Sequence, residues 1–158
     1  DSSIVFDLIV EDYMLLAVPK KYKMLQKAEK REGEKYPWMD ISMMPNEFII
    51  QDNSCYVRQE IDQIFEEYGK KLKPKMIVNS SMLAMQTLER GMGFCFISEV
   101  FLPYITNTKD IDFFCIGKNK VKKTKTGIIY LKNKILSRQE KYCISVLKEK
   151  IRNGEIGA

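Results

Sequence analysis

The sequence predicts an α/β protein with a largely parallel sheet. From residue 13 onward, the expected order of elements is strand, helix, strand, helix, strand, strand, strand, helix. Strands that alternate with helices are typical of parallel sheets joined by helical crossovers. Residues 46–103 carry two consecutive strand-then-helix units, the clearest part of this pattern. With 158 residues, 45% of them hydrophobic, the chain can bury a core as one domain or as two small lobes.

The first expected strand covers residues 13–18, a continuous apolar run that is closed by a proline. A short helix is expected within 23–31. Residues 38–44 are expected to form a loop or a single helical turn that inserts Trp38 or a methionine into the core. A second strand is expected at 48–50, where another short apolar run occurs.

Residues 54–68 form the most regular expected helix, because apolar side chains recur there every three or four positions. These side chains are Val57, Ile61, Ile64, Phe65 and Tyr68. Gly69 is expected to end the helix, and we interpret its apolar stripe as core packing rather than as an oligomer seam. A strand at 76–78, a helix over 81–90 and a strand at 94–97 should follow.

The remaining part of the chain is expected to contain strands at 112–116 and 126–132, separated by a lysine-rich loop. Ser137 is expected to cap a long helix over 138–152. The apolar face of that helix comprises Tyr142, Cys143, Val146, Leu147 and Ile151. The final expected element is therefore an amphipathic helix.

The net charge of +5 arises mainly from two groups of lysines, within residues 20–35 and 118–125. Such groups can contact the phosphates of nucleic acids. We prefer to interpret them as solvated loops, because acidic residues interrupt the first group and no aromatic residue lies within the second.

The residue content argues against metal sites, cysteine catalysis and membrane insertion. The chain has no histidine, and its cysteines form no CxxC pair, so neither zinc ligation nor a Cys–His pair is expected. These cysteines are Cys55, Cys95, Cys115 and Cys143. We expect buried, reduced thiols in a cytoplasmic protein, and no apolar run is long enough to predict a membrane span. Because the sequence starts with neither Met nor a secretion signal, we expect a piece cut from a longer protein.

Short polar side chains follow two of the expected strands, at the point where each gives way to a helix. Gln51, Asp52, Asn53 and Ser54 form the first turn, and Asn79, Ser80 and Ser81 form the second. In a parallel sheet such turns gather at the edge where α/β proteins usually bind ligands. The unpaired N–H groups of a helix start suit an anion or a carboxylate. The alternative is a local role, in which Asn53 or Ser54 only caps the following helix.

No catalytic motif accompanies these turns. Gly91 and Gly93 do not form a dinucleotide loop, and a helix-ending glycine followed by a tight turn is the preferred interpretation. The sequence contains no Walker loop, HExxH or GxSxG string. We therefore nominate no catalytic residue, no metal ligand and no cofactor, and we expect the chain to bind a small molecule without converting it.

The order of these motifs resembles the effector-binding domain of LysR-type transcriptional regulators. The run EDYMLLAVPKK at 11–21 resembles the opening of that domain's second lobe. The remaining motifs follow in the family's order: Asp40-Ile41, the strand at 46–50, Val57-Arg58, Phe65, Gly69, Met76-Ile77-Val78, Ser80-Ser81 and Gly91-Met92-Gly93-Phe94. The string TGIIYLK and the final helix resemble the return into the first lobe.

The sequence also departs from the family's pattern. Ser98 stands where the family usually has a proline, and Tyr22-Lys23-Met24 replaces its usual His-Pro. The DNA-binding winged helix-turn-helix and the first part of lobe one have no counterpart here. We therefore expect a fragment that begins as the polypeptide crosses from the first lobe to the second.

The resemblance implies a periplasmic-binding-protein-like (type 2) sensor fold, with a mixed, mostly parallel sheet and helices on both faces. One full lobe and part of another are expected. Residues 1–11 would cross from lobe one, residues 12–117 would form lobe two, and residues 118–158 would return into lobe one.

The implied function is to sense a small polar or anionic metabolite in a cleft between the lobes, whose second-lobe wall would be the seven turn residues. The resemblance further implies a cytoplasmic homodimer or homotetramer, with the helix at 54–68 as a candidate dimer surface. DNA would be bound only through a domain absent from this chain. The alternatives are a solute-binding protein that delivers its ligand to a transporter and, less favoured, an α/β enzyme.

Overall fold

The computed structural model describes residues 3–118 and 120–153. The chain divides into two compact units: unit 1 comprises Asp1–Asp12 and Lys123–Ala158, and unit 2 comprises Tyr13–Lys122. No helix among the described residues is long and apolar enough to cross a membrane.

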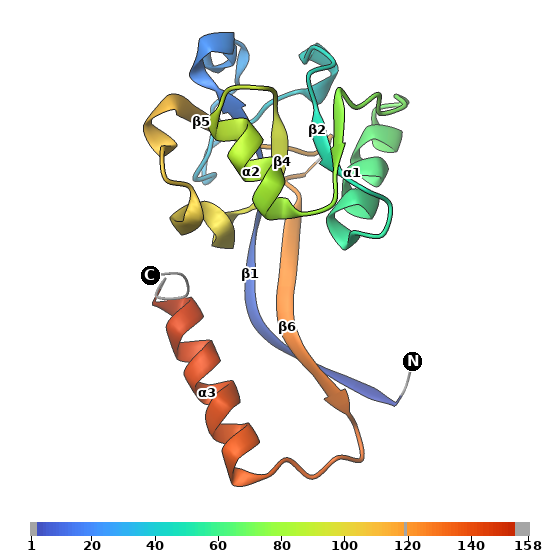
Figure 1. Cartoon of the computed structure of the whole chain (residues 1–158), viewed down its shortest axis with the longest axis vertical. Helices are drawn as coiled ribbons and strands as arrows, with labels where there is room; N and C mark the ends of the chain where they lie inside the picture. Colours follow the sequence, from blue (N-terminus) through green and yellow to red (C-terminus); the bar gives the residue numbers. More distant parts are fainter. Residues whose placement is uncertain (1–2, 119, 154–158) are drawn as a thin grey trace. The chain divides into compact units, whose positions relative to one another are not determined.

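The sheet of unit 2 is centred on β1 (Ile4–Pro19), whose second half belongs to this unit (Figure 1). This strand pairs antiparallel with β4 (Cys95–Ser98) on one side and with β5 (Ile111–Cys115) on the other. It is longer than the expected strand at 13–18, because its alternating first half continues the extended backbone into unit 1.

A second group of strands extends this sheet beyond β4. Strand β2 (Ile49–Gln51) pairs parallel with β3 (Met76–Val78), and a parallel bridge joins Phe48 to Phe94 at the start of β4. The Ile49 N–H donates to the Phe94 carbonyl at 2.7 Å, and the Phe94 N–H donates to the Glu47 carbonyl at 2.9 Å. The strand order is therefore β3, β2, β4, β1, β5.

The α/β class predicted from the sequence is confirmed, but the expectation of a mostly parallel sheet is wrong for β1. A helical crossover returns the chain to the same end of the sheet and so gives parallel neighbours, as it does for β2 and β3. The two neighbours of β1 are β4 and β5, which follow it only after several intervening elements rather than after a single helical crossover. Both of those pairings are antiparallel.

Helices cover both faces of this sheet, as expected. Side chains of β1 alternate between two cores: Met14, Leu16 and Val18 pack in the core that contains residues of α1 (Tyr56–Glu67). Leu15 and Ala17 pack in the core that contains residues of α2 (Ser81–Glu89). The apolar run at 13–18 is thus continuous because the strand is buried on both sides.

An aromatic cluster occupies the first of these cores. The ring of Phe48 lies 5.2 Å from that of Phe65, 5.7 Å from that of Phe94 and 5.7 Å from that of Phe96, on which it stacks. Only 1% of Phe48 is exposed. The cluster therefore ties α1 to both β2 and β4.

The short helix expected within 23–31 is present only as one 3-10 turn in its first half. Two short 3-10 helices, Lys20–Tyr22 and Met24–Lys27, occupy the region, and the chain then extends so that Glu29 pairs with Trp38. Lys23 separates the two turns with a left-handed φ of 52°, which a continuous α-helix cannot contain.

The single helical turn expected within 38–44 is present as a 3-10 helix at Ile41–Met43. Two methionines near it, Met39 and Met44, are buried in the core, whereas Trp38 is half-buried. The interpretation of this segment as a core-filling turn is confirmed.

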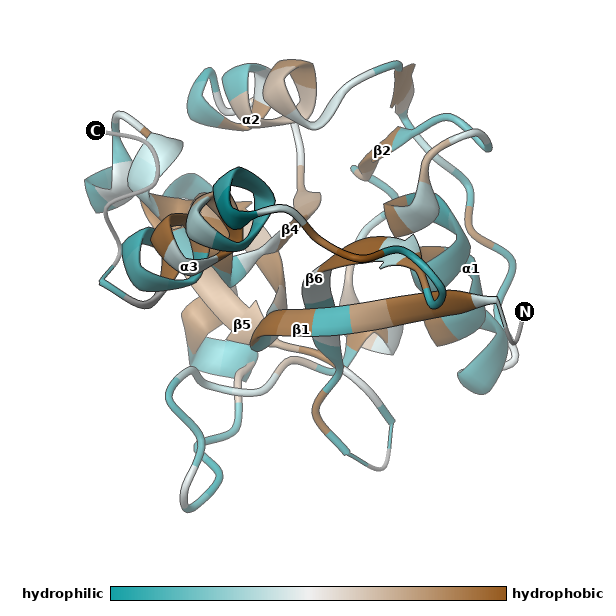
Figure 2. Cartoon of the chain, turned by 90° about the horizontal axis from the view of Figure 1, so that it is seen from below, coloured by the Kyte–Doolittle hydropathy of each residue, from teal (hydrophilic) through white to brown (hydrophobic). Residues whose placement is uncertain are grey.

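Unit 1 contains the first half of β1, the strand β6 (Lys123–Leu131), which pairs with β1, and the helix α3 (Arg138–Arg152). The Lys148 ammonium donates to the Asp7 carboxylate at 2.7 Å and so ties α3 to β1. Many apolar side chains of this unit are exposed, among them Ile4, Phe6, Leu8, Ile129, Leu131 and Tyr142. Figure 2 shows the hydrophobic colouring of β1 and β6.

Helix α3 begins with a capping box, which confirms Ser137 as its cap. The Ser137 hydroxyl accepts from the Glu140 N–H at 3.2 Å, and the Glu140 carboxylate accepts from the Ser137 N–H at 2.9 Å. The Lys134 ammonium also donates to Glu140, at 2.5 Å. These contacts, led by that of Lys134, lower the pKa of Glu140 from its ordinary value of 4.5 to about 2.

Acidification is expected to loosen the start of α3. Because the folded pKa of Glu140 lies below its unfolded value, its stabilising effect is present above about pH 4.5 and is lost as the pH falls toward about 2. Carbon NMR should show the Glu140 carboxyl titrating well below pH 4.5, and the amides of the first turn of α3 should lose protection over the same interval. A Glu140→Gln variant should lose that pH dependence. A Glu140 carboxyl that titrates at its ordinary value would contradict the prediction.

Candidate functional site

The two polar turns leave the same edge of the sheet, side by side. Strands β2 and β3 are parallel with Gln51 opposite Val78, so their carboxyl ends are neighbours. The Asp52 N–H donates to the Val78 carbonyl at 2.9 Å, and the Gln51 side-chain amide donates to the Ser81 hydroxyl at 3.3 Å. The starts of α1 and α2 therefore lie next to each other, with N–H groups of both first turns near one small area.

The first turn is closed by Asp52 rather than by a cap on the helix. The Asp52 carboxylate accepts from the Ser54 N–H at 2.9 Å and from its hydroxyl at 2.5 Å, and these bonds lower the pKa of Asp52. The expectation that Asn53 or Ser54 caps the helix is wrong, because α1 begins only at Tyr56 with Cys55 in the cap position. Asn53 and Ser54 are left exposed beside the turn.

The second turn contains a conventional cap. The Ser80 hydroxyl accepts from the Leu83 N–H at 3.2 Å, which satisfies one donor of the first turn of α2. Asn79 and Ser80 are exposed and Ser81 is half-buried. Ser80 alone performs the capping, so Asn79 and Ser81 supply polar groups that the helix start does not use.

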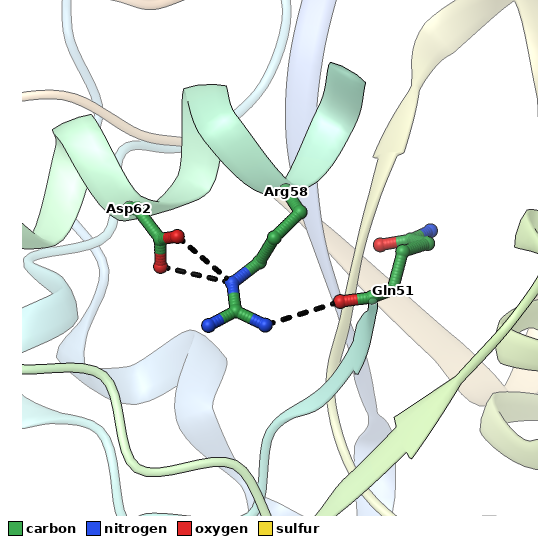
Figure 3. Close-up of polar contacts among 3 residues, drawn as sticks. All are labelled: Gln51, Arg58 and Asp62. Atoms are coloured by element: carbon green, nitrogen blue, oxygen red, sulfur yellow. Dashed lines mark hydrogen bonds and ion pairs between the residues drawn. The ribbon is translucent and has the colours of Figure 1, made fainter. Parts of the chain in front are cut away.

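Gln51 connects the two turns and is the most buried of the seven candidate residues, with 1% of its surface exposed. Its side-chain oxygen is buried and has no hydrogen-bond partner among the described residues. The main-chain carbonyl of Gln51 accepts from the Arg58 guanidinium at 3.2 Å. Figure 3 shows that this carbonyl points toward Arg58 and that the side-chain amide points away from it.

Arg58 is the residue of this region that the sequence did not indicate as part of the candidate site. Its Nε donates to both carboxylate oxygens of Asp62, at 2.9 and 3.0 Å, while another nitrogen of the guanidinium holds the end of β2 (Figure 3). The spacing of four residues between Arg58 and Asp62 was the available signal. Since Asp62 pairs with it, Arg58 acts here as a support for Gln51 rather than as a free positive charge.

The seven residues carry one negative charge, that of Asp52, and no positive one. Any attraction for an anion must therefore come from the N–H groups and dipoles at the starts of α1 and α2. Such an arrangement can hold hydroxyl, amide or carboxylate groups of a small molecule through hydrogen bonds. Two cavities of unit 2, of about 250 and 260 Å³, are lined by other residues.

Neither metal binding nor thiol chemistry is supported within residues 3–118 and 120–153. No three Cys, Asp or Glu side chains gather there in a way that could hold a metal ion. Burial raises the pKa of Cys95 to about 12, which keeps it as an unreactive thiol. The expectation of buried thiols is confirmed for Cys95 and Cys115, whereas Cys55 is half-buried and Cys143 is exposed.

No protein-family profile matches the sequence, and a comparison with curated proteins found no significant match. Solved structures do match. The chain aligns over 99% of its length with the effector-binding domain of QuiR in complex with shikimate, at a TM-score of 0.67 and 14% identity. It aligns over 96% of its length with the CcmR regulatory domain from Synechocystis PCC6803 in complex with 2-PG, at a TM-score of 0.69 and 13% identity. The chain has the effector-binding-domain fold of LysR-type regulators.

The same fold occurs within a longer protein, HinK, a LysR family transcriptional regulator from Pseudomonas aeruginosa. The chain aligns with HinK over 96% of its own length, at a TM-score of 0.67 and 14% identity. It spans 49% of HinK and 68% of each of the QuiR and CcmR domains. The resemblance derived from the order of motifs is thus confirmed for the fold, and these matched proteins are regulatory rather than enzymatic.

Proposed function

We propose that this chain is the ligand-sensing part of a bacterial LysR-type transcriptional regulator, which binds a small polar or anionic metabolite. The observation that carries the proposal is the placement of the two turns. In an effector-binding-domain fold, the parallel pairing of β2 with β3 sets the starts of α1 and α2 side by side at one edge of the sheet.

We base the division into lobes on the two units. We assign residues 12–117 to the second lobe, residues 1–11 to the crossover from lobe one and residues 118–158 to the return into lobe one. The unit boundaries at Asp12/Tyr13 and Lys122/Lys123 lie within a few residues of these limits, which supports the assignment.

The ligand would be held mainly by neutral donors and acceptors. Backbone N–H groups at the two helix starts would take a carboxylate, and the exposed side chains of Asn53 and Asn79, with the half-buried Ser81 hydroxyl, would bind hydroxyl or amide groups. Asp52 and Gln51 would orient the two turns and complete the wall with Ser54 and Ser80. The metabolites bound to QuiR and CcmR, shikimate and 2-PG, support a ligand of this small size.

Ligand binding would act without catalysis. A ligand that prefers one arrangement of a regulator's subunits shifts their equilibrium and so changes the affinity for DNA. DNA would be contacted through another domain of the complete protein, a cytoplasmic homodimer or homotetramer in which α1 is a candidate dimer surface.

A matched pair of variants tests the placement of the ligand. Calorimetry of this chain and of the complete regulator with a panel of small carboxylates, shikimate included, should identify a binder. The double variant Asn53→Ala/Asn79→Ala removes two exposed amides that cap no helix. It should weaken binding roughly tenfold, since each hydrogen bond contributes about 0.5–1.5 kcal/mol. Gln86→Ala, which removes an exposed amide from α2, is the control and should bind as the wild type does.

Equal affinities for the double variant and the wild type would contradict the proposed wall. The complete protein separates the proposal from its alternative: a helix-turn-helix preceding this region supports a regulator. A secretion signal would instead indicate a solute-binding protein that serves a transporter.

A further inference from the structure

A cavity opens on unit 2, at the edge of the sheet opposite the two turns. It has a volume of about 260 Å³ and includes Lys20, Lys21, Arg90 and Gly91. The direction of the strands gives this location. Strand β1 runs antiparallel to β4, and Lys20 follows its end. Strand β2 runs parallel to β4 at the Phe48–Phe94 bridge. The end of β1 and the end of β2 therefore lie at opposite edges of the sheet.

Three exposed positive side chains line this cavity, from two segments, and the Arg90 guanidinium also donates to the Gln86 carbonyl of its own helix at 3.4 Å. Lys20 and Lys21 come from the turn after β1, and Arg90 comes from the end of α2. Among the residues that the structure describes, no carboxylate lies within 4 Å of any of these three charged groups. Glu47 lies within electrostatic range of Lys21, but its carboxylate is bound by Lys75 and Tyr22.

The two acidic residues that line the cavity are engaged by the protein itself. Glu89 accepts from the backbone N–H groups of Thr106 and Asn107, at 2.6 and 3.2 Å. Asp110 accepts from the Asn107 side-chain amide at 2.5 Å. These carboxylates hold the loop after β4 in place and keep their charges, so the lining carries three positive and two negative groups and is positive overall. Lys20 also lies within electrostatic range of Asp112.

The exposed side chain of Lys21 lies beside Tyr22 and Gly91. Its ammonium lies 5.3 Å from the centre of the Tyr22 ring, which itself packs edge-on against the buried ring of Phe94. A side-chain carbon at Gly91 would lie 3.2 Å from the Lys21 ammonium, so the absence of a side chain there leaves room for it. Gly91 has a φ of +68°, which also favours glycine at this position.

We propose that this cavity is a second anion site, which takes a compact oxyanion such as phosphate or a phosphate group of a metabolite. Three positive groups on two segments can surround a tetrahedral anion, and Arg90 can present two parallel N–H donors to it. The site is separate from the proposed effector wall and shares only α2 with it, since that helix begins at the wall and ends at the cavity.

Titration of the whole chain with inorganic phosphate tests the proposal. Amide NMR resonances of Lys21, Arg90 and Gly91 should shift with millimolar phosphate, and they should not shift with sodium chloride of equal ionic strength. Lys21→Ala/Arg90→Ala should weaken phosphate binding roughly tenfold, because two of three charge-assisted contacts are lost. The control Lys27→Ala/Lys30→Ala removes the same charge from exposed positions elsewhere and should bind as the wild type does.

Three results would overturn the proposal. The first is a set of shifts that lie away from this cavity, and the second is equal shifts with phosphate and chloride. The third is equal weakening in both double variants, which would mean that the anion responds only to the net charge of the chain. The phosphate-induced amide shifts of the wild-type chain test the proposal even where a variant folds poorly.

Discussion

Replacing Gly93 by alanine is expected to destabilise unit 2 by about 3 kcal/mol, the upper part of the range for overpacked sites. A side-chain carbon at this position would lie 2.2 Å from the carbonyl oxygen of Glu47 and 3.1 Å from two side-chain carbons of Ile49. That carbonyl accepts from the Phe94 N–H, so the added methyl group would force β2 away from β4. Urea unfolding followed by circular dichroism measures the loss.

The matched control is Gly69→Ala, at the end of α1. No atom would lie within 4 Å of its added carbon, and its cost arises only from a left-handed φ of +65°. That cost is about 1–2 kcal/mol. If Gly93→Ala is no more destabilising than Gly69→Ala, the close contact between β2 and β4 is not a constraint on the fold.

Replacing Phe48 by alanine is expected to destabilise unit 2 by about 3–5 kcal/mol, the usual cost of removing a buried phenyl ring. Phe48 is 1% exposed, and its ring contacts the rings of Phe65, Phe94 and Phe96. The variant therefore loses transfer free energy and leaves a void between α1 and the sheet. Because Phe48 precedes the turn of the proposed ligand wall, a stably folded Phe48→Ala protein should also bind ligand more weakly.

Phe101→Ala provides the comparison for Phe48→Ala. This ring is 38% exposed and lies 6.1 Å from the ring of Tyr104. Its removal should cost about 1 kcal/mol, as expected for a partly exposed apolar side chain. Similar losses of unfolding free energy for the two variants would show that the aromatic cluster does not hold α1 on the sheet.

The sequence predicted most helices and strands because their signals are local. Gly69 ends α1 with a positive φ, and its N–H donates to the Glu66 carbonyl at 2.8 Å. Ser80 and Ser137 cap helices through side-chain bonds to backbone groups three residues onward. Each of these contacts joins residues close in sequence, so residue type alone indicates it.

The features that the sequence did not reveal depend on distant contacts. Strand direction at β1 is set by pairing between Leu16 and two residues far along the chain, Phe96 and Phe114. The extended backbone at Glu29 depends on Trp38, whose indole N–H donates to the Gly117 carbonyl at 2.8 Å. Periodicity within 23–31 could not show either contact, so a helix was predicted there instead.

The seven turn residues show the same contrast between local and distant contacts. Composition located the seven polar residues at two strand ends, but it could not distinguish their roles. Gln51 is buried and Asn53 is exposed, although both are amides in one turn. The bond from Arg58 to the Gln51 carbonyl arises from the way α1 folds back over β2, which no spacing in the sequence encodes directly.

The alternation of β1 between two apolar cores has a consequence for strand register. Usually a slip by one residue is prevented because it would bury polar side chains and expose apolar ones. Residues 14–18 are all buried, so such a slip would leave only apolar groups inside. It would, however, place Ala17 in the α1 core and the larger Leu16 in the α2 core, and close-packed interiors tolerate neither the void nor the excess volume. The register of β1 is therefore selected by side-chain size.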